Sequence, residues 1–375
     1  MESRRSDTAP VVLFGYDSSP FTNKVRLTLQ LKQIPYTFVI VPSMMPRPIL
    51  KDHFNVTYRK IPVLAIGREI YIDTSLILET LEHQFPPSKG YGTIYPSPTP
   101  STTNRCRPLI RGFASYWTDR PLFRVTTGLI PSSVWRTRFG IDRANLIGHK
   151  LDPDKLERKV PQNLSGLDLH LSLLEPLFSP GSEERKWIFD APTPSAADIA
   201  LWYQLDWGEK ISRGEGTEDL TGGGTSDRPG EGMEAVFNGQ RYPGLTAWFE
   251  RVKTFFDGLP RMETRVERED KGGIRNLLDR LKLTRLLEQT PLLPTPARPH
   301  TSLDMRNGLV PGAEVGVAPD DTGRDSPTVG TLVAVTPEEV VITPRDNGQD
   351  TSLGELRIHF PRIGFVARPI ERARL

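Results

Sequence analysis

Hydrophobic residues recur with two different periods near the start of the chain. The continuous apolar run VVLF at 11–14 is typical of a short buried strand, and a turn follows it. Beyond Pro20 the apolar residues are spaced four apart, which predicts a helix that ends before Pro35. This stripe consists of Phe21, Val25 and Leu29. Ser19 then falls at the N-cap of the helix and Pro20 at its first position, where a missing N–H costs nothing.

The same patterns continue to about residue 85. YTFVIV at 36–41 predicts a second strand, and IPVLAI at 61–66 with EIYI at 69–72 predicts an antiparallel hairpin. DTSLILETLE at 73–82 predicts a helix with an apolar face. The order is β-α-β, a connection, then β-β-α. This order predicts an α/β unit.

Three segments rich in proline, glycine or polar residues interrupt the chain. They lie at 86–104, 213–232 and 289–302. The second is too polar and too rich in glycine to pack, so we expect a disordered insertion there. These breaks predict domains at 9–86, 104–288 and 303–372. The middle domain is expected to be helical.

The last domain has a different pattern. Valine and isoleucine alternate with polar residues between turn signals, which is the period of half-buried strands. These stretches are GAEVGVAP, TVGTLVAVT, EEVVITP and GELRIHF. They predict a small β-barrel-like domain. His359 is interpreted as a strand residue rather than a catalyst, and no aromatic and basic motif indicates nucleic-acid binding.

Composition narrows the class of protein. The chain has 375 residues, of which 37% are hydrophobic and 25% charged, and its formal net charge is +2, which implies neither nucleic acid nor an anionic membrane as a partner. No apolar run approaches the roughly twenty residues that span a bilayer, and MESRRSDTAP lacks a hydrophobic signal core, so a cytoplasmic protein is expected. The single cysteine, Cys106, excludes an intrachain disulfide. The six histidines lack metal-ligand spacing, so no metal is predicted.

The turn before the first helix is a candidate site. Ser19 has two interpretations: it caps the helix, or it presents a hydroxyl beside the positive end of a helix dipole, where an anion is stabilised. Ser18 competes for the second role. Pro62 inside a strand-like run is a local conflict, which indicates a cis bond after Ile61 and a site nearby.

These residues carry a family resemblance. SSPFTNKVRLTLQLKQIPY, with KIPVLAIGREIYIDTSLI, resembles the thioredoxin-like N-terminal domain of serine-type glutathione transferases over about 85 residues. WIFDAPTPSAADIALWYQLDWG and YPGLTAWFERVKTFF resemble helices of the family's second domain more weakly. The resemblance implies an α/β thioredoxin-like N-terminal domain plus an all-α glutathione-transferase-like domain, followed here by the small β-barrel-like domain.

The resemblance also implies roles for individual residues. Ser19 matches the position that donates a hydrogen bond to the glutathione sulfur. The segment whose backbone holds the cysteinyl part of glutathione is matched by Ile61 and Pro62. The pair that receives the γ-glutamyl group is matched by Asp73 and Thr74. The residue near the glycine carboxylate is matched by Lys60. Asp73 and Thr74 are also plausible as a helix cap, and Lys60 as a solvated charge.

The second domain holds a candidate substrate pocket in FASYWTDRPLFR. The residues at the positions that line the electrophile pocket in the family are Tyr116, Trp117, Arg120 and Phe123. Aromatic residues at helical spacing are also typical of a core, and this alternative stays open.

The leading hypothesis is a cytoplasmic homodimer that adds the glutathione thiolate to a small apolar electrophile, with glutathione as substrate and no metal. Serine cannot form a mixed disulfide, so a dithiol redox cycle through Ser19 is excluded. One alternative is a glutathione-dependent isomerase resembling maleylacetoacetate isomerase, although the cysteine of that family's signature is replaced here by Pro20. The other is a non-catalytic glutathione-transferase-like protein-interaction module.

Overall fold

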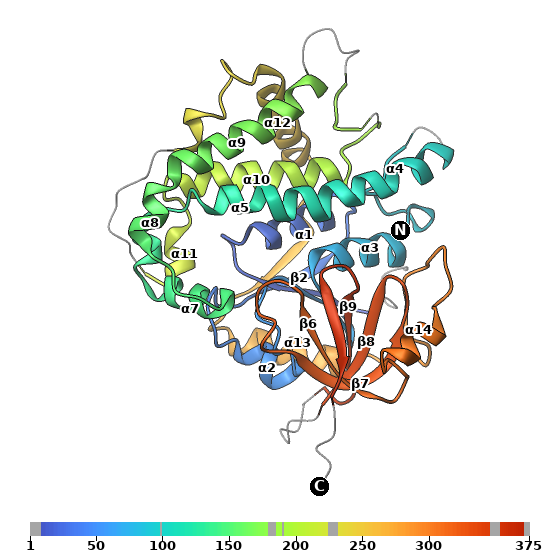
Figure 1. The fold of residues 1–375 in the computed structure, drawn as a ribbon. Coiled ribbons are helices and arrows are strands. Elements are labelled where there is room, and N and C mark those ends of the chain that lie inside the picture. Colours follow the sequence, from blue (N-terminus) through green and yellow to red (C-terminus); the bar gives the residue numbers. More distant parts are fainter. Residues whose placement is uncertain are drawn as a thin grey trace.

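The fold comes from a computed structural model that describes residues 9–97, 100–178, 185–189, 191–223, 232–345 and 353–370, with side chains from 106 onward in the helix that starts at Pro100. Helices lie on both faces of a long sheet, and the strands near the C-terminus extend that sheet (Figure 1). None of the described helices has both the length and the apolar character needed to cross a bilayer.

The first unit has the thioredoxin-like order that the sequence predicts. Its strands are β1 (Val11–Gly15), β2 (Tyr36–Ile40), β3 (Val63–Ile66) and β4 (Glu69–Ile72). Its helices are α1 (Pro20–Leu31), α2 (Pro48–Phe54), α3 (Thr74–Gln84) and the short η1 (Pro87–Lys89). β1 pairs parallel with β2 and antiparallel with β3, and β3 with β4 forms the hairpin. The connection at Gly67 has a positive φ of 60°, which glycine adopts without penalty.

The middle of the chain is helical. Its elements are α4 (Pro100–Gly112), η2 (Phe113–Leu122), α5 (Phe123–Thr127), α6 (Ser132–Trp135), α7 (Arg138–Ile147), α8 (Pro153–Arg158), α9 (Val160–Leu174), η3 (Glu175–Leu177), α10 (Ala196–Ser212), α11 (Thr217–Thr221), η4 (Met233–Ala235) and α12 (Pro243–Asp257). α4 begins four residues before the predicted boundary at 104. η2 is a π-helix that contains Pro121, which has no N–H for the usual α-helical bond.

The predicted insertion at 213–232 is only partly described. Residues 224–231 lie outside the described residues. Within the described part, α11 is helical, and Leu220 is 3% exposed in a core cluster. Disorder is therefore the wrong prediction for this part. Leu220 buries its side chain in the core, and this contact holds the otherwise polar segment against the protein.

The predicted end of the helical domain at 288 is also wrong. β5 (Glu263–Val266) pairs parallel with β2 and becomes an edge of the sheet. α13 (Lys271–Lys282) packs its leucines against the face of the sheet that also receives α2. α13 is amphipathic, and its buried leucines Leu277, Leu278 and Leu281 pack on the sheet rather than on the helical domain.

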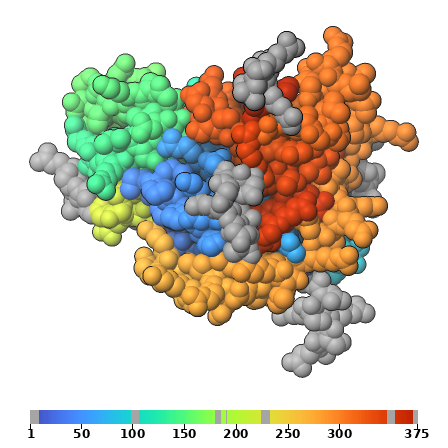
Figure 2. All heavy atoms as spheres, turned by 90° about the horizontal axis from the view of Figure 1, so that it is seen from below, coloured from blue at the N-terminus to red at the C-terminus, as the bar shows by residue number. Residues whose placement is uncertain are grey.

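The C-terminal residues form an additional β unit after α14 (Thr301–Arg306). Its strands are β6 (Glu314–Pro319), β7 (Thr328–Val335), β8 (Glu339–Pro344), β9 (Arg357–Pro361) and β10 (Phe365–Pro369), in the spatial order 10-6-7-8-9. β9 pairs parallel with β4, so all ten strands form one continuous sheet. Figure 2 shows this unit, in orange and red, packed against the blue N-terminal part.

Two hydrophobic cores lie on opposite faces of the sheet. Along β1, Val11 and Leu13 belong to the core shared with α1, α3 and most of the helical domain, whereas Val12 and Phe14 belong to the core shared with α2, α13 and the C-terminal strands. This alternation follows from the two-residue period of a strand. The C-terminal unit therefore shares its core with the first unit.

Candidate functional site

The turn between β1 and α1 places Ser19 at the N-cap of a twelve-residue helix. Its backbone is extended, with φ −77° and ψ 117°, and its Oγ accepts a hydrogen bond from the Thr22 N–H at 3.2 Å. The hydroxyl proton has no acceptor in the part of the chain that the structure describes. A hydroxyl both accepts and donates, so Ser19 keeps a donor at the positive end of α1. The residue is 2% exposed.

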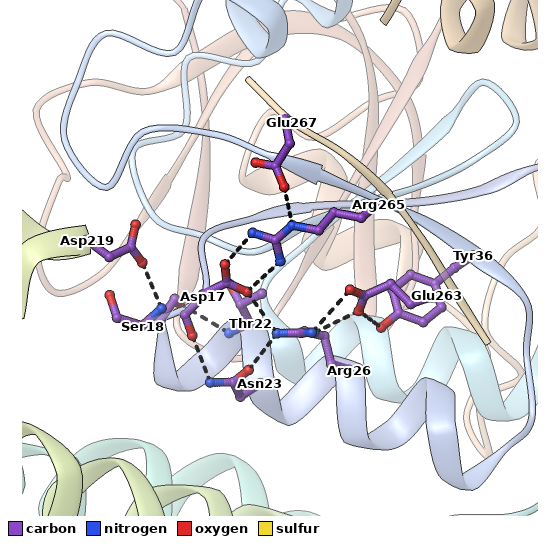
Figure 3. A network of polar contacts seen from close by, with 11 residues as sticks. Asp17, Ser18, Thr22, Asn23, Arg26, Tyr36, Asp219, Glu263, Arg265 and Glu267 are labelled. Atoms are coloured by element: carbon purple, nitrogen blue, oxygen red, sulfur yellow. Dashed lines mark hydrogen bonds and ion pairs between the residues drawn. The ribbon is translucent and has the colours of Figure 1, made fainter. Parts of the chain in front are cut away.

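Ser18 differs from Ser19 in its contacts. Its Oγ is buried and has no hydrogen-bond partner among the described residues. Its N–H donates to Asp219 Oδ2 of α11 at 2.8 Å, and its carbonyl accepts from Trp207 Nε1 of α10 at 3.0 Å. Helices α10 and α11 therefore close over the turn, and a carboxylate of the protein already lies at it (Figure 3).

Figure 3 also shows how β5 is attached beside this turn. Arg26 of α1 pairs with Glu263, and Tyr36 donates to the same carboxylate at 2.6 Å. Arg265 forms a hydrogen-bonded pair with Asp17, which holds the pKa of that carboxyl below its usual value. These contacts hold the outer edge of the sheet against the helix that carries Ser19.

Asp73 and Thr74 lie at the start of α3. Asp73 Oδ1 accepts from Ser75 N–H at 2.9 Å and from Ser75 Oγ at 2.6 Å, so Asp73 is the N-cap. Its φ of 73° with ψ 140° is a conformation that residues other than glycine rarely adopt. Thr74 is buried, and its hydroxyl donates to Asp119 Oδ2 at 3.3 Å. The bond between Ile61 and Pro62 is cis, as the sequence predicts.

Lys60 is paired within the protein. Its Nζ lies 2.6 Å from Asp321 Oδ1, in the connection between β6 and β7. Arg120 lies 3.8 Å from Asp320 of the same connection. Two cations that the sequence assigns to ligand contacts therefore face acidic residues of the C-terminal unit.

The four residues of the predicted pocket do not share one surface. Trp117 Nε1 donates to His170 Nδ1 of α9 at 2.8 Å, inside the helical domain. Tyr116 is 58% exposed and lies near Arg120, whose guanidinium carbon is 5.9 Å from its ring centre. Phe123 packs edge-on against Phe21 of α1, with ring centres 4.7 Å apart. The structure therefore places Phe123 against α1, whereas Trp117 contacts α9.

Sequence reasoning missed a buried polar cluster beneath this region. Lys24 of α1 is fully buried, and its Nζ contacts Asp119 Oδ2 and the Ala114 carbonyl, both at 2.7 Å. Tyr203 of α10 donates to Asp119 Oδ1 at 2.8 Å, and burial, then the charge of Asp119, raises the pKa of this phenol. The one sequence signal is the four-residue spacing of Lys24, Thr28 and Lys32, all buried, the first two in α1 and the third just after it.

No group of three or more histidine, cysteine or acidic side chains is placed to hold a metal ion in the described ranges. The candidate site consists of Ser19 at the N-terminus of α1, the N-terminus of α3 capped by Asp73, and two cations, Lys60 and Arg120, that face acidic residues. This is the layout of a thioredoxin-like domain with a helical partner domain.

Comparison with known proteins agrees with this class. Residues 13–89 match the family model "Glutathione S-transferase, N-terminal domain", and residues 126–220 match a domain of unknown function (DUF7962). Glutathione S-transferases U4 and U1 from Arabidopsis thaliana are each 33% identical over 72 residues, 19% of this chain and 32% of theirs. The chain thus spans about a third of the length of these curated relatives. The N-terminal domain of this chain is therefore similar to that of glutathione S-transferases.

One solved structure shares the fold beyond that domain. The crystal structure of a GST-like protein from Pseudomonas syringae is 23% identical, with a TM-score of 0.60 over 96% of this chain and all of that one. Rice GST1, solved in complex with glutathione, is 18% identical, with a TM-score of 0.42 over 73% of this chain and 99% of its own. The first match covers nearly the whole chain, so the C-terminal strands belong to an architecture that also occurs in another GST-like protein.

Proposed function

We propose that this protein binds glutathione at the turn between β1 and α1 and adds its thiolate to a small apolar electrophile. The observation that carries the proposal is the hydrogen-bonding state of Ser19. Its Oγ accepts the Thr22 N–H, which orients the hydroxyl and leaves its proton to be donated to a sulfur anion. The family model spans this turn and the segment from Lys60 to Thr74.

The chemistry follows from the ionisation of the thiol. A free cysteine thiol titrates near 8.5, and the thiolate is the nucleophile. A hydroxyl hydrogen bond to the anion and the helix N-terminus together contribute about 1.5–3 kcal/mol, which lowers the thiol pKa by about one to two units. A large share of the bound thiol is then ionised at neutral pH.

The remaining contacts follow the family pattern. Ile61 and Pro62 would hold the cysteinyl backbone, Asp73 and Thr74 the γ-glutamyl group, and Lys60 the glycine end. The rare backbone conformation of Asp73 supports a site at α3, because such strain is concentrated at binding sites. A cytoplasmic homodimer, inferred from the resemblance to that family, completes the proposal.

Substitution of Ser19 by alanine tests the proposal. We expect turnover of glutathione with a generic aryl halide to fall roughly 10- to 100-fold, because one hydrogen bond to a charged group is lost. Ser19→Thr keeps a hydroxyl and should retain activity, and Ser18→Ala is the matched control. The cap is lost as well, so urea unfolding should show a loss of about 1 kcal/mol in Ser19→Ala. Unchanged turnover in Ser19→Ala, or its loss in Ser18→Ala alone, would contradict the assignment.

A non-catalytic glutathione-transferase-like module is the second candidate. Three observations favour it. Ser19 is only 2% exposed, the Asp219 carboxylate accepts from the Ser18 N–H at the turn, and the Asp321 carboxylate pairs with Lys60. Titration of the glutathione thiol in the complex separates the two functions. A lowered thiol pKa with turnover supports the transferase, whereas binding with an unshifted thiol pKa and no turnover supports the module.

A further inference from the structure

The connection between β6 and β7 joins all three parts of the molecule next to the candidate site. Asp321 pairs with Lys60 of the first unit, and Asp320 lies near Arg120 of η2. The Gly323 N–H donates to the Leu146 carbonyl of α7 at 2.9 Å. This connection is the part of the C-terminal unit that reaches the predicted ligand residues.

The position of Asp321 is set by the fold around it. The Asp320 N–H donates to the Gly364 carbonyl at 2.9 Å, and Arg324 Nε donates to the Asp321 carbonyl at 3.1 Å. Below the connection, the rings of Tyr58 and Phe365 are 5.8 Å apart, which joins the segment before Lys60 to β10. These contacts fix the backbone that carries Asp321 beside Lys60.

The pair between Lys60 and Asp321 is charged and within reach of solvent. Burial raises the pKa of Asp321, but the hydrogen bond and charge of Lys60 outweigh it, and the pKa lies below its usual value. The two side chains are 29% and 49% exposed. A ligand group can therefore reach Lys60, but it meets an ionised carboxylate there.

We propose that Asp321 determines ligand preference at this site, by competing with the C-terminal carboxylate of a γ-glutamyl thiol peptide for Lys60. The site then prefers a thiol peptide whose C-terminal end is uncharged, such as an amide. The inference rests on the proposed function, because Lys60 is taken to receive the glycine end. A second carboxylate at Lys60 shares one ammonium with Asp321 and is repelled by it, whereas an amide N–H donates to Asp321 and carries no charge.

The other charges at this end support the same preference. Asp320 adds a second negative charge to the connection, and the charges of Asp73 and Asp321 both act on the Tyr58 phenol. Arg120 faces Asp320, and Arg324 donates to the connection itself. Arg59, the residue before Lys60, pairs with Asp142 of α7 at 3.1 Å, so the neighbouring cations also have partners within the protein.

Calorimetric titration of the full chain with γ-Glu-Cys-Gly and with its C-terminal amide tests the proposal. We expect the amide to bind about three- to fivefold more tightly at low salt, a factor typical of a partly exposed ion pair. Asp321→Asn should tighten binding of the free acid and so abolish the preference for the amide, whereas Asp321→Glu should keep this preference. The matched control is Asp325→Asn, which removes one charge from an exposed position of the same connection and should leave the ratio unchanged.

The outcomes separate this inference from the proposed function. If neither peptide binds, both are overturned. If both bind but the free acid binds as tightly as the amide, or if Asp321→Asn and Asp325→Asn change the ratio equally, only the role of Asp321 is overturned. Ser19→Ala should weaken both peptides by the same factor and leave their ratio intact.

Discussion

Lys24 shows how one side chain links two units of the molecule. Its ammonium is removed from water and compensated by Asp119 and the Ala114 carbonyl. Asp119 is in turn bound by Tyr203 and Thr74. A buried ion pair is tolerated when additional hydrogen bonds satisfy both partners, and this cluster meets that condition. It positions the start of α3 relative to η2 and α10.

We expect Lys24→Met to lower the free energy of unfolding by about 3 kcal/mol, because Asp119 would stay buried without its cation. Urea unfolding at pH 7 measures the change. Lys210→Met is the control, since Lys210 pairs with Asp206 at the surface and should cost less than about 0.5 kcal/mol. A loss of similar size in both variants would show that the buried pair has no special role.

At the scale of an element, α10 depends on its first turn. Ser195 and Asp198 form a capping box. Asp198 also accepts from the Ile188 N–H at 2.8 Å and from Trp248 Nε1 of α12 at 3.0 Å. One carboxylate therefore fixes the start of the helix that carries Tyr203 and Trp207.

Asp198→Ala should cost about 3 kcal/mol of unfolding free energy, because several buried donors lose their acceptor together. Asp152→Ala removes the exposed N-cap of α8 and should cost about 1 kcal/mol or less. Thermal and urea unfolding followed by circular dichroism compare the two. Equal losses would mean that Asp198 acts only as an ordinary cap.

At the scale of the whole molecule, a buried histidine lies where the C-terminal unit joins the first unit. His359 of β9 contacts Glu339 of β8 through Nδ1 at 2.7 Å and Glu69 of β4 through Nε2 at 2.9 Å. Arg357 pairs with Glu69 at 2.6 Å. Burial alone lowers the pKa of His359, but the hydrogen bonds and charges of the two glutamates outweigh it and raise the pKa.

This raised pKa predicts that the junction is weakened by alkaline pH. A histidine whose folded pKa exceeds its unfolded value near 6.5 contributes full stability below 6.5 and loses it as pH rises through the folded pKa. Thermal unfolding of the wild type between pH 6 and pH 9 should show this loss. His359→Gln should unfold with about 3 kcal/mol less free energy at pH 6 and show a smaller dependence on pH. A parallel pH dependence in the two proteins would refute the assignment.

Much of the candidate site could be predicted from the amino-acid sequence. The first strands, the helix after Pro20 and the cap positions of Ser19 and Asp73 follow from periodicity and cap chemistry, which act over a few residues. The domain boundaries could not be predicted from the sequence in the same way. β5 and α13 have ordinary local patterns, and nothing local indicates that they return to the first sheet.

The amino-acid sequence by itself determined which residues start helices and alternate across strands, because these properties depend on neighbours along the chain. Only the tertiary structure decided which polar and charged groups meet. The partners of Ser18 and Lys60 lie 201 and 261 residues away, and His359 contacts a glutamate 290 residues away. Long-range pairs of this kind depend on how whole elements pack, since a buried charge must find a partner wherever the fold brings one near it.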